Sequence, residues 1–67
     1  MDTIKRVQDL MQERDMNLCV LAKKCGISYS TIQTTARRRG QLSVETIERI
    51  CLGLGITLKD FFDSSYL

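Results

Sequence analysis

One short pattern occurs four times in this chain and constrains its fold more than any other feature. In each copy an apolar residue is followed by Asn, Ser or Thr and, four positions later, by a second apolar residue. The polar side chain can cap a helix N-terminus, while the two apolar residues close around it as a hydrophobic staple. The copies are Met16-Asn17-x3-Leu21, Ile27-Ser28-x3-Ile32, Leu42-Ser43-x3-Ile47 and Ile56-Thr57-x3-Phe61. These signals predict four helix starts.

Glycine stands near the expected ends of three of these helices, at Gly26, Gly40 and Gly55. Glycine is the usual residue just past a helix C-terminus because it adopts a left-handed conformation without strain. A further helix starts near Asp2 and carries an apolar face before the first copy of the pattern. The prediction is an all-α, compact five-helix fold within a single domain spanning 1–67. The predicted helices cover about 3–14, 18–25, 29–37, 44–53 and 58–63.

The apolar residues on the inner faces of these helices predict the core. We expect it to contain Ile4, Val7, Leu10, Leu21, Ala22, Cys25, Ile27, Ile32, Ile47, Ile50, Cys51, Leu54, Ile56, Leu58 and Phe61. The three cysteines (Cys19, Cys25 and Cys51) are an odd number at spacings that no zinc site uses. They are predicted to be small buried apolar residues.

Size and composition exclude several classes of function. A chain of 67 residues buries too little surface to enclose a substrate cavity beside a separate scaffold. There is no histidine, no glycine-rich phosphate loop and no pairing of a nucleophile with a base, so we expect neither an enzyme nor a metal or other cofactor. No apolar run reaches membrane-spanning length, and no signal peptide opens the chain. The expectation is a cytoplasmic protein without a membrane partner.

The charges are unevenly distributed along the chain. From Met16 to Val44 there are five bases (Lys23, Lys24, Arg37, Arg38 and Arg39) and no acid. The remaining five bases and eight acids give the rest of the chain a charge of −3, so the net +2 conceals a basic centre. An acid-free basic stretch within a small folded domain favours binding to a polyanion such as DNA, although a solvated charged surface has the same composition.

The third predicted helix is unusually polar. Between Ser28 and Arg39 its only large aliphatic residue is Ile32, and three threonines make it a poor helix by intrinsic propensity. A helix that is weak, polar and yet held at its start indicates a functional surface. Its hydroxyl and amide groups can bind base edges and phosphate oxygens.

The centre of the chain resembles the helix-turn-helix of the phage-repressor (Cro/repressor-like, XRE-type) DNA-binding family. The resemblance is carried by Leu21-Ala22-x3-Gly26-Ile27-Ser28-x-Ser30-Thr31-Ile32. The segment Ser43-x-Glu45-Thr46-Ile47-x2-Ile50-Cys51-x-Gly53-Leu54-Gly55-Ile56-Thr57-Leu58-x-Asp60-Phe61-Phe62 looks like the fourth and fifth helices of that family. Together these segments imply a repressor-like domain in which the second and third helices form the helix-turn-helix.

The resemblance also implies which residues bind DNA. The helix at about 29–37 would enter the major groove, with Ile32 anchoring it from behind. The residues implied to bind DNA are Asn17, Ser28, Tyr29, Ser30, Gln33, Thr34, Arg37, Arg38 and Arg39. Of these, Tyr29, Ser30, Gln33 and Thr34 would face the DNA, and we expect Gln33 and Thr34 to contact base edges. The arginines would approach the DNA backbone, and Asn17 would lie near a phosphate.

Four positions depart from the usual family pattern. The family often has Gln at Leu18, where that side chain contacts the DNA backbone and supports the recognition helix. It often has an acid at Ala36, glycine at Arg38 and proline at Leu42. The changes at Ala36 and Arg38 make this corner more cationic, and they leave the shape of the loop at 38–42 open.

Two functions from different classes remain. The first is a sequence-specific, double-stranded DNA-binding transcriptional regulator of repressor type. One small module reads few base pairs, so we expect a homodimer on a palindromic operator. Its interface is expected in the C-terminal part, at Phe62, Tyr66 and Leu67, since the sequence offers no separate dimerisation domain. The second is a protein-interaction module of the same fold, such as an antitoxin or an accessory inhibitor.

Overall fold

Five helices form the part of the chain that the structure describes. The computed structural model describes residues 2–63. The helices are α1 (Thr3–Glu13), α2 (Leu18–Cys25), α3 (Tyr29–Arg37), α4 (Val44–Leu54) and α5 (Leu58–Phe62). Residues 2–63 contain no strand, and the predicted helix boundaries are within one residue of the observed ones. The predicted all-α fold of five helices is confirmed.

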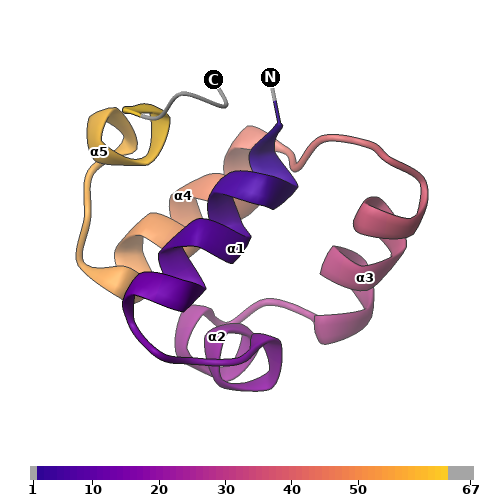
Figure 1. The fold of residues 1–67 in the computed structure, drawn as a ribbon, viewed down its shortest axis with the longest axis horizontal. Helices are drawn as coiled ribbons and strands as arrows, with labels where there is room; N and C mark the ends of the chain where they lie inside the picture. The colour runs from indigo at the N-terminus through magenta and orange to yellow at the C-terminus, as the bar shows by residue number, and fades with distance from the viewer. Residues whose placement is uncertain (1, 64–67) are drawn as a thin grey trace.

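The helices surround a core to which all five contribute. α2 packs along α4, α5 packs against α4, and α3 contacts both α1 and α2. In Figure 1, α3 and α5 lie at opposite edges of the molecule. The polar helix α3 therefore has neighbours on one side only, and its other side is open to solvent.

Side-chain caps at the helix starts follow the repeated pattern in three of its four copies. Asn17 accepts a hydrogen bond from the backbone N–H of Val20, and Ser43 accepts one from that of Thr46. Thr57 and Asp60 form a complete capping box. Hydrogen bonds from the backbone and hydroxyl of Thr57 stabilise the Asp60 carboxylate and lower its pKa. Ser28 is the exception, because its hydroxyl bonds that of Ser30 (2.9 Å) and does not cap α3.

One of the three glycines predicted to end a helix does not do so. Gly26 and Gly55 are left-handed as predicted, with φ of 66° and 72°. Gly40 is not the left-handed residue after α3. That conformation is taken by Arg39 (φ 55°), and after α1 it is taken by Asp15 (φ 52°). In each case, the chain turns back so that backbone N–H groups beyond the helix satisfy its last carbonyls.

The core matches the predicted set with two differences. The buried apolar residues are Val7, Leu10, Leu21, Ala22, Cys25, Ile32, Leu42, Ile47, Ile50, Cys51 and Phe61. Ile4, Ile27, Leu54 and Ile56 are partly buried against them. The prediction for Leu58 is wrong: it is 39% exposed and lines an open crevice between α4 and α5. Leu42, identified only as a staple residue from the sequence, belongs to the core.

The prediction for the cysteines is confirmed at Cys25 and Cys51 and wrong at Cys19. Cys19 is exposed, because it lies on the side of α2 turned away from Leu21 and Cys25. Burial raises the pKa of both the Cys25 and the Cys51 thiols. The two buried cysteines are therefore neutral thiols: that of Cys25 donates to the carbonyl oxygen of Ile50 on α4, and that of Cys51 donates to the carbonyl oxygen of Thr57.

Gly53, inside α4, marks the closest approach between α2 and α4. A Cβ atom at this position would lie 2.9 Å from the Cα of Cys25 and would overlap its sulfur. Glycine is a poor residue inside a helix, costing about 0.5–1 kcal/mol relative to alanine. The packing of the two helices explains its presence, because only a residue without a side chain fits here.

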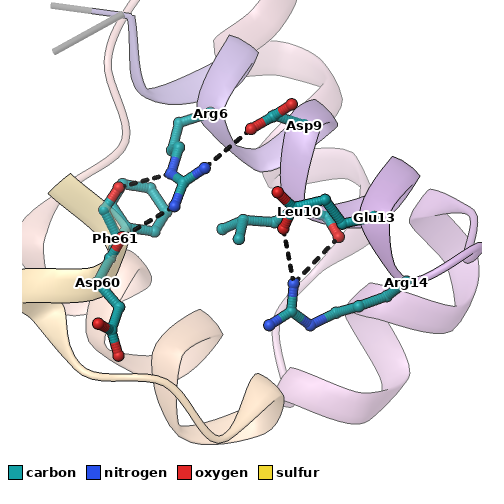
Figure 2. Close-up of polar contacts among 7 residues, drawn as sticks. All are labelled: Arg6, Asp9, Leu10, Glu13, Arg14, Asp60 and Phe61. Atoms are coloured by element: carbon teal, nitrogen blue, oxygen red, sulfur yellow. Dashed lines mark hydrogen bonds and ion pairs between the residues drawn. The ribbon is translucent and has the colours of Figure 1, made fainter. Parts of the chain in front are cut away.

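Arg6 is a buried cation that joins α1 to α5 (Figure 2). Its Nε donates to the carbonyl oxygen of Phe61 (2.7 Å), and its Nη2 donates to that of Asp60 (2.8 Å). Its Nη1 forms an ion pair with Asp9 at 2.8 Å. The guanidinium thus bonds two carbonyls at the end of α5, where a short helix leaves carbonyls without intrahelical partners. The Asp60 carbonyl also accepts from the backbone N–H of Asp63. Nothing in the sequence pattern predicts this contact, since the partners are 54 and 55 residues apart.

Candidate nucleic-acid interface

The helix-turn-helix consists of α2, the turn at Gly26–Ser28 and α3. Ile32 is 3% exposed and is the only buried residue of α3. Ala22 is buried on α2, where its small side chain allows the two helices to approach. Arg49 of α4 braces the turn, donating to the carbonyl oxygen of Gly26 (3.3 Å) while it pairs with Glu45. The turn is therefore attached to α4, and α3 is attached through Ile32.

The exposed surface of α3 carries five of the nine candidate DNA-binding residues, and the other four flank α2 or α3. All nine candidates are exposed: Asn17, Ser28, Tyr29, Ser30, Gln33, Thr34, Arg37, Arg38 and Arg39. At 100° per residue, Thr34 lies about 160° from Ile32 around the helix, so it points away from the core. Gln33 lies to one side, where it borders a crevice between α3, α1 and α2. Thr34 therefore points straight outward and Gln33 obliquely.

Two pairs of side chains on this surface are already joined by hydrogen bonds. Nε2 of Gln33 donates to the hydroxyl of Tyr29 at 2.7 Å, one helical turn away. The hydroxyls of Ser28 and Ser30 are 2.9 Å apart. These bonds restrict the side-chain rotamers, so the polar surface is partly ordered before any ligand arrives.

Leu18 occupies the position where the resemblance expects glutamine. It is partly buried and packs against the core. It also lines a crevice of about 250 Å³, whose other lining residues are Ile4, Val7, Gln8, Met11, Ile32, Gln33, Ala36 and Arg37. Leu18 thus packs on the core side of α3 through apolar contact. Its side chain offers no hydrogen bond to a DNA backbone.

The arginine run continues from α3 into the loop at 38–42. Arg37 is the last residue of α3, Arg38 has a right-handed backbone and Arg39 a left-handed one. Arg38 therefore does not need the glycine that the family often has there, because the left-handed residue lies one position later. None of the three arginines forms a hydrogen bond or an ion pair through its side chain within residues 2–63, which leaves their guanidinium groups available to a polyanion.

The loop is held in place from the start of α1. The side-chain oxygen of Gln41 accepts hydrogen bonds from both the backbone N–H (2.9 Å) and the hydroxyl (2.8 Å) of Thr3. The Thr3 hydroxyl in turn accepts from the backbone N–H of Leu42 (2.9 Å), and Thr3 is fully buried. This network, which we call the Thr3 network, fixes the loop shape that the sequence left open. Sequence reasoning missed both Thr3 and Gln41, because neither belongs to a recognisable pattern.

Asn17 lies at the N-terminus of α2, as predicted. Its side-chain oxygen caps α2 by accepting a hydrogen bond from the backbone N–H of Val20 (2.9 Å). The amide NH₂ group remains as a donor beside the positive end of the helix dipole. The residue therefore presents the correct type of group for a phosphate oxygen.

The left-handed backbone of Arg39 permits a test that separates charge from stability. We expect Arg39→Gly to raise the free energy of unfolding by about 0.5–1 kcal/mol, because the left-handed conformation strains every residue that has a Cβ. We also expect it to flatten the log–log salt dependence of DNA binding by about one unit if Arg39 contacts a phosphate. Denaturant unfolding and salt titrations of duplex binding measure the two effects.

Asp15→Gly is the matched control, since Asp15 has the same backbone conformation after α1. It should stabilise the fold by less, because aspartate tolerates this conformation better than arginine does. It should leave the salt slope unchanged. A second variant neutralises all three arginines (37–39). If DNA binding by this variant and by Arg39→Gly has the same salt dependence as binding by the parent, the arginines do not bind phosphates.

Comparison with known families agrees with this geometry. The family described as the Cro/C1-type HTH DNA-binding domain matches residues 6–64, nearly the whole chain. Searches of curated proteins and of solved structures gave no significant match. Within residues 2–63 no helix is long and apolar enough to cross a membrane, and no group of three or more His, Cys, Asp or Glu side chains could hold a metal ion. The match covers α1 from Arg6 onward and all of α2 to α5, including the α2–turn–α3 unit with its exposed polar face, and the chain belongs to the Cro/C1-type helix-turn-helix DNA-binding family.

Proposed function

We propose that the chain is a single domain spanning 1–67 that binds specific sequences of double-stranded DNA and regulates transcription as a repressor. In this proposal α3 lies in the major groove with Tyr29, Ser30, Gln33 and Thr34 toward the bases. The observation that carries it is the polar, exposed face of α3 ending in three arginines that have no protein partner within residues 2–63. Ser28, Asn17 and the arginines are assigned to the DNA backbone.

The test is selection of bound sites from a random duplex pool, with the parent chain and with Gln33→Ala and Thr34→Ala. Glutamine can pair bidentately with adenine, and the threonine methyl can contact thymine; each interaction is worth about 1–3 kcal/mol of discrimination. Each variant should therefore relax the preference at one base position while the thermal midpoint stays unchanged, since both side chains are exposed. An unchanged motif at unchanged affinity in both variants would refute this assignment.

We further propose that two copies bind one palindromic operator through the C-terminal part of the chain. Apolar groups on this part support the proposal: Leu52 is 83% exposed, Leu58 39% and Phe62 40%. The Phe62 ring lies edge-on to the buried Phe61, with centroids 5.2 Å apart. The other two predicted interface residues, Tyr66 and Leu67, lie outside the described residues.

Deleting Tyr66 and Leu67 should reduce cooperative binding to a full operator more than it reduces binding to a half operator. The reason is that a dimer with recognition helices about 34 Å apart gains affinity only when both half-sites are present. Binding to full and half operators is compared, and the mass of each complex is measured. One protomer per full site with full affinity would remove the dimer from this proposal.

The same measurements distinguish the proposal from a protein-interaction module of this fold. A DNA-binding regulator should bind random duplex weakly with a steep salt dependence and bind selected sites more tightly. A protein-interaction module should yield no enriched site from the pool.

A further inference from the structure

The bond between Tyr29 and Gln33 links two residues that project from the exposed surface of α3. They are four positions apart, so they lie on the same side of the helix, one turn from each other. Nε2 of Gln33 is 2.7 Å from the Tyr29 hydroxyl, and both residues are exposed. Neither has another side-chain partner within residues 2–63. A short hydrogen bond between two otherwise unpartnered side chains fixes the direction in which the glutamine amide points.

The chemistry of the two groups determines what remains available to a ligand. An amide has one acceptor oxygen and two N–H donors, and the Tyr29 hydroxyl occupies one of these donors. The second N–H and the carbonyl oxygen of the amide remain. In the major groove, this N–H can donate to N7 of adenine while the carbonyl oxygen accepts from its N6 amino group. The Tyr29 hydroxyl accepts from Gln33, so its own hydrogen is free to donate.

We propose that Tyr29 and Gln33 form one reading unit, in which Tyr29 positions the Gln33 amide for adenine and donates its own hydroxyl hydrogen to an acceptor on the neighbouring base pair. Tyr29 is a positioning residue for Gln33 as well as a contact. The unit rests on the proposed function, because it requires α3 to lie in a major groove. It goes further by making the base preference at one position depend on a residue one turn away.

Tyr29 is the only residue within residues 2–63 whose side chain forms a hydrogen bond with Gln33. Most of the crevice that Gln33 borders is lined by apolar side chains such as Leu18 and Ile32, and its two other polar lining residues, Gln8 and Arg37, form no hydrogen bond with the amide. The amide is therefore oriented by Tyr29. Removing the hydroxyl leaves the glutamine free to adopt other rotamers, which it must give up again when it binds a base.

The experiment compares Tyr29→Phe, Gln33→Ala and the double variant by site selection and by affinity for the selected site. Selection with Gln33→Ala first identifies the base position that Gln33 reads. Tyr29→Phe should then reduce the discrimination at that same position by about fivefold, with thermal midpoint and salt slope unchanged. In the Gln33→Ala background, Tyr29→Phe should cause no further loss at that position, because the two residues act together.

Thr35→Val is the matched control. It also removes one hydroxyl from α3, but that hydroxyl bonds the carbonyl of Thr31 and makes no contact with the pair. It should leave the base preference unchanged.

Three results would overturn the proposal. If Gln33→Ala relaxes the base preference at one position of the site and Tyr29→Phe does not, the reading unit is wrong while the proposed function stands. If Tyr29→Phe weakens all sequences equally and leaves the base preference at the Gln33 position intact, its hydroxyl binds a phosphate and does not position Gln33. If Gln33→Ala changes nothing, the base contact in the proposed function is wrong, and the reading unit falls with it.

Discussion

Arg6→Met should lower the free energy of unfolding by about 3 kcal/mol, a large fraction of the total for a domain of this size. The substitution keeps an unbranched apolar stem in place of the arginine stem but removes three hydrogen bonds. The carbonyl of Phe61 loses its only donor within residues 2–63, and Asp9 loses its ion-pair partner. Each buried polar group without a partner costs about 1–3 kcal/mol. Urea unfolding followed by circular dichroism measures the change.

Arg14→Met is the control that separates this network from the loss of any arginine on α1. Arg14 also bonds a carbonyl and a carboxylate, those of Leu10 and Glu13 (Figure 2), but both distances are 3.4 Å and its side chain is 30% exposed. Such an exposed pair contributes less than about 1 kcal/mol. If Arg6→Met and Arg14→Met unfold at the same urea concentration, the buried network does not stabilise the fold as described.

Gly53→Ala should destabilise the domain by about 1–3 kcal/mol, even though alanine is the better helix former. The new methyl group would overlap the sulfur of Cys25 and lie 2.9 Å from its Cα, so α2 and α4 would have to move apart. Both helices contribute buried core residues. Separating them therefore disturbs the centre of the core. Thermal and urea unfolding measure the loss.

Gly40→Ala tests whether the effect is specific to this site, because a methyl group there would meet nothing closer than 3.8 Å. It should change stability little. Adding Cys25→Ala to Gly53→Ala should restore part of the loss, since it removes the sulfur but leaves the backbone contact. A Gly53→Ala variant as stable as the parent would show that the helices do not need this close approach.

Local signals in the sequence predict the helices, and their success has a physical reason. Asn17, Ser43 and Thr57 cap backbone groups only three residues away, so the sequence contains both partners of each bond. The signal failed at Ser28, where a second serine two positions later competes for the hydroxyl. It failed at Gly40 because Arg39 accepts a strained conformation that propensity assigns to glycine.

Contacts between distant segments could not be predicted in this way. Arg6 bonds residues 54 and 55 positions away, and Thr3 bonds Gln41 across 38 positions. Neither pair belongs to a periodic pattern, because one hydrogen bond between remote segments leaves no repeat in the sequence. For the candidate site, the sequence and the family resemblance predicted the exposed helix and its residues. The pairing of Tyr29 with Gln33 required coordinates, since many rotamers of the two side chains do not bring them together.

The Thr3 network also affects how such a protein can change in evolution. The loop with Arg38 and Arg39 is held by the start of α1, while the outward residues of α3, such as Ser30 and Thr34, make no core contact. Substitutions at those exposed positions therefore leave both the core and the loop intact. Under the proposed function, a lineage with this architecture can therefore change its base preference one exposed residue at a time at little cost in stability.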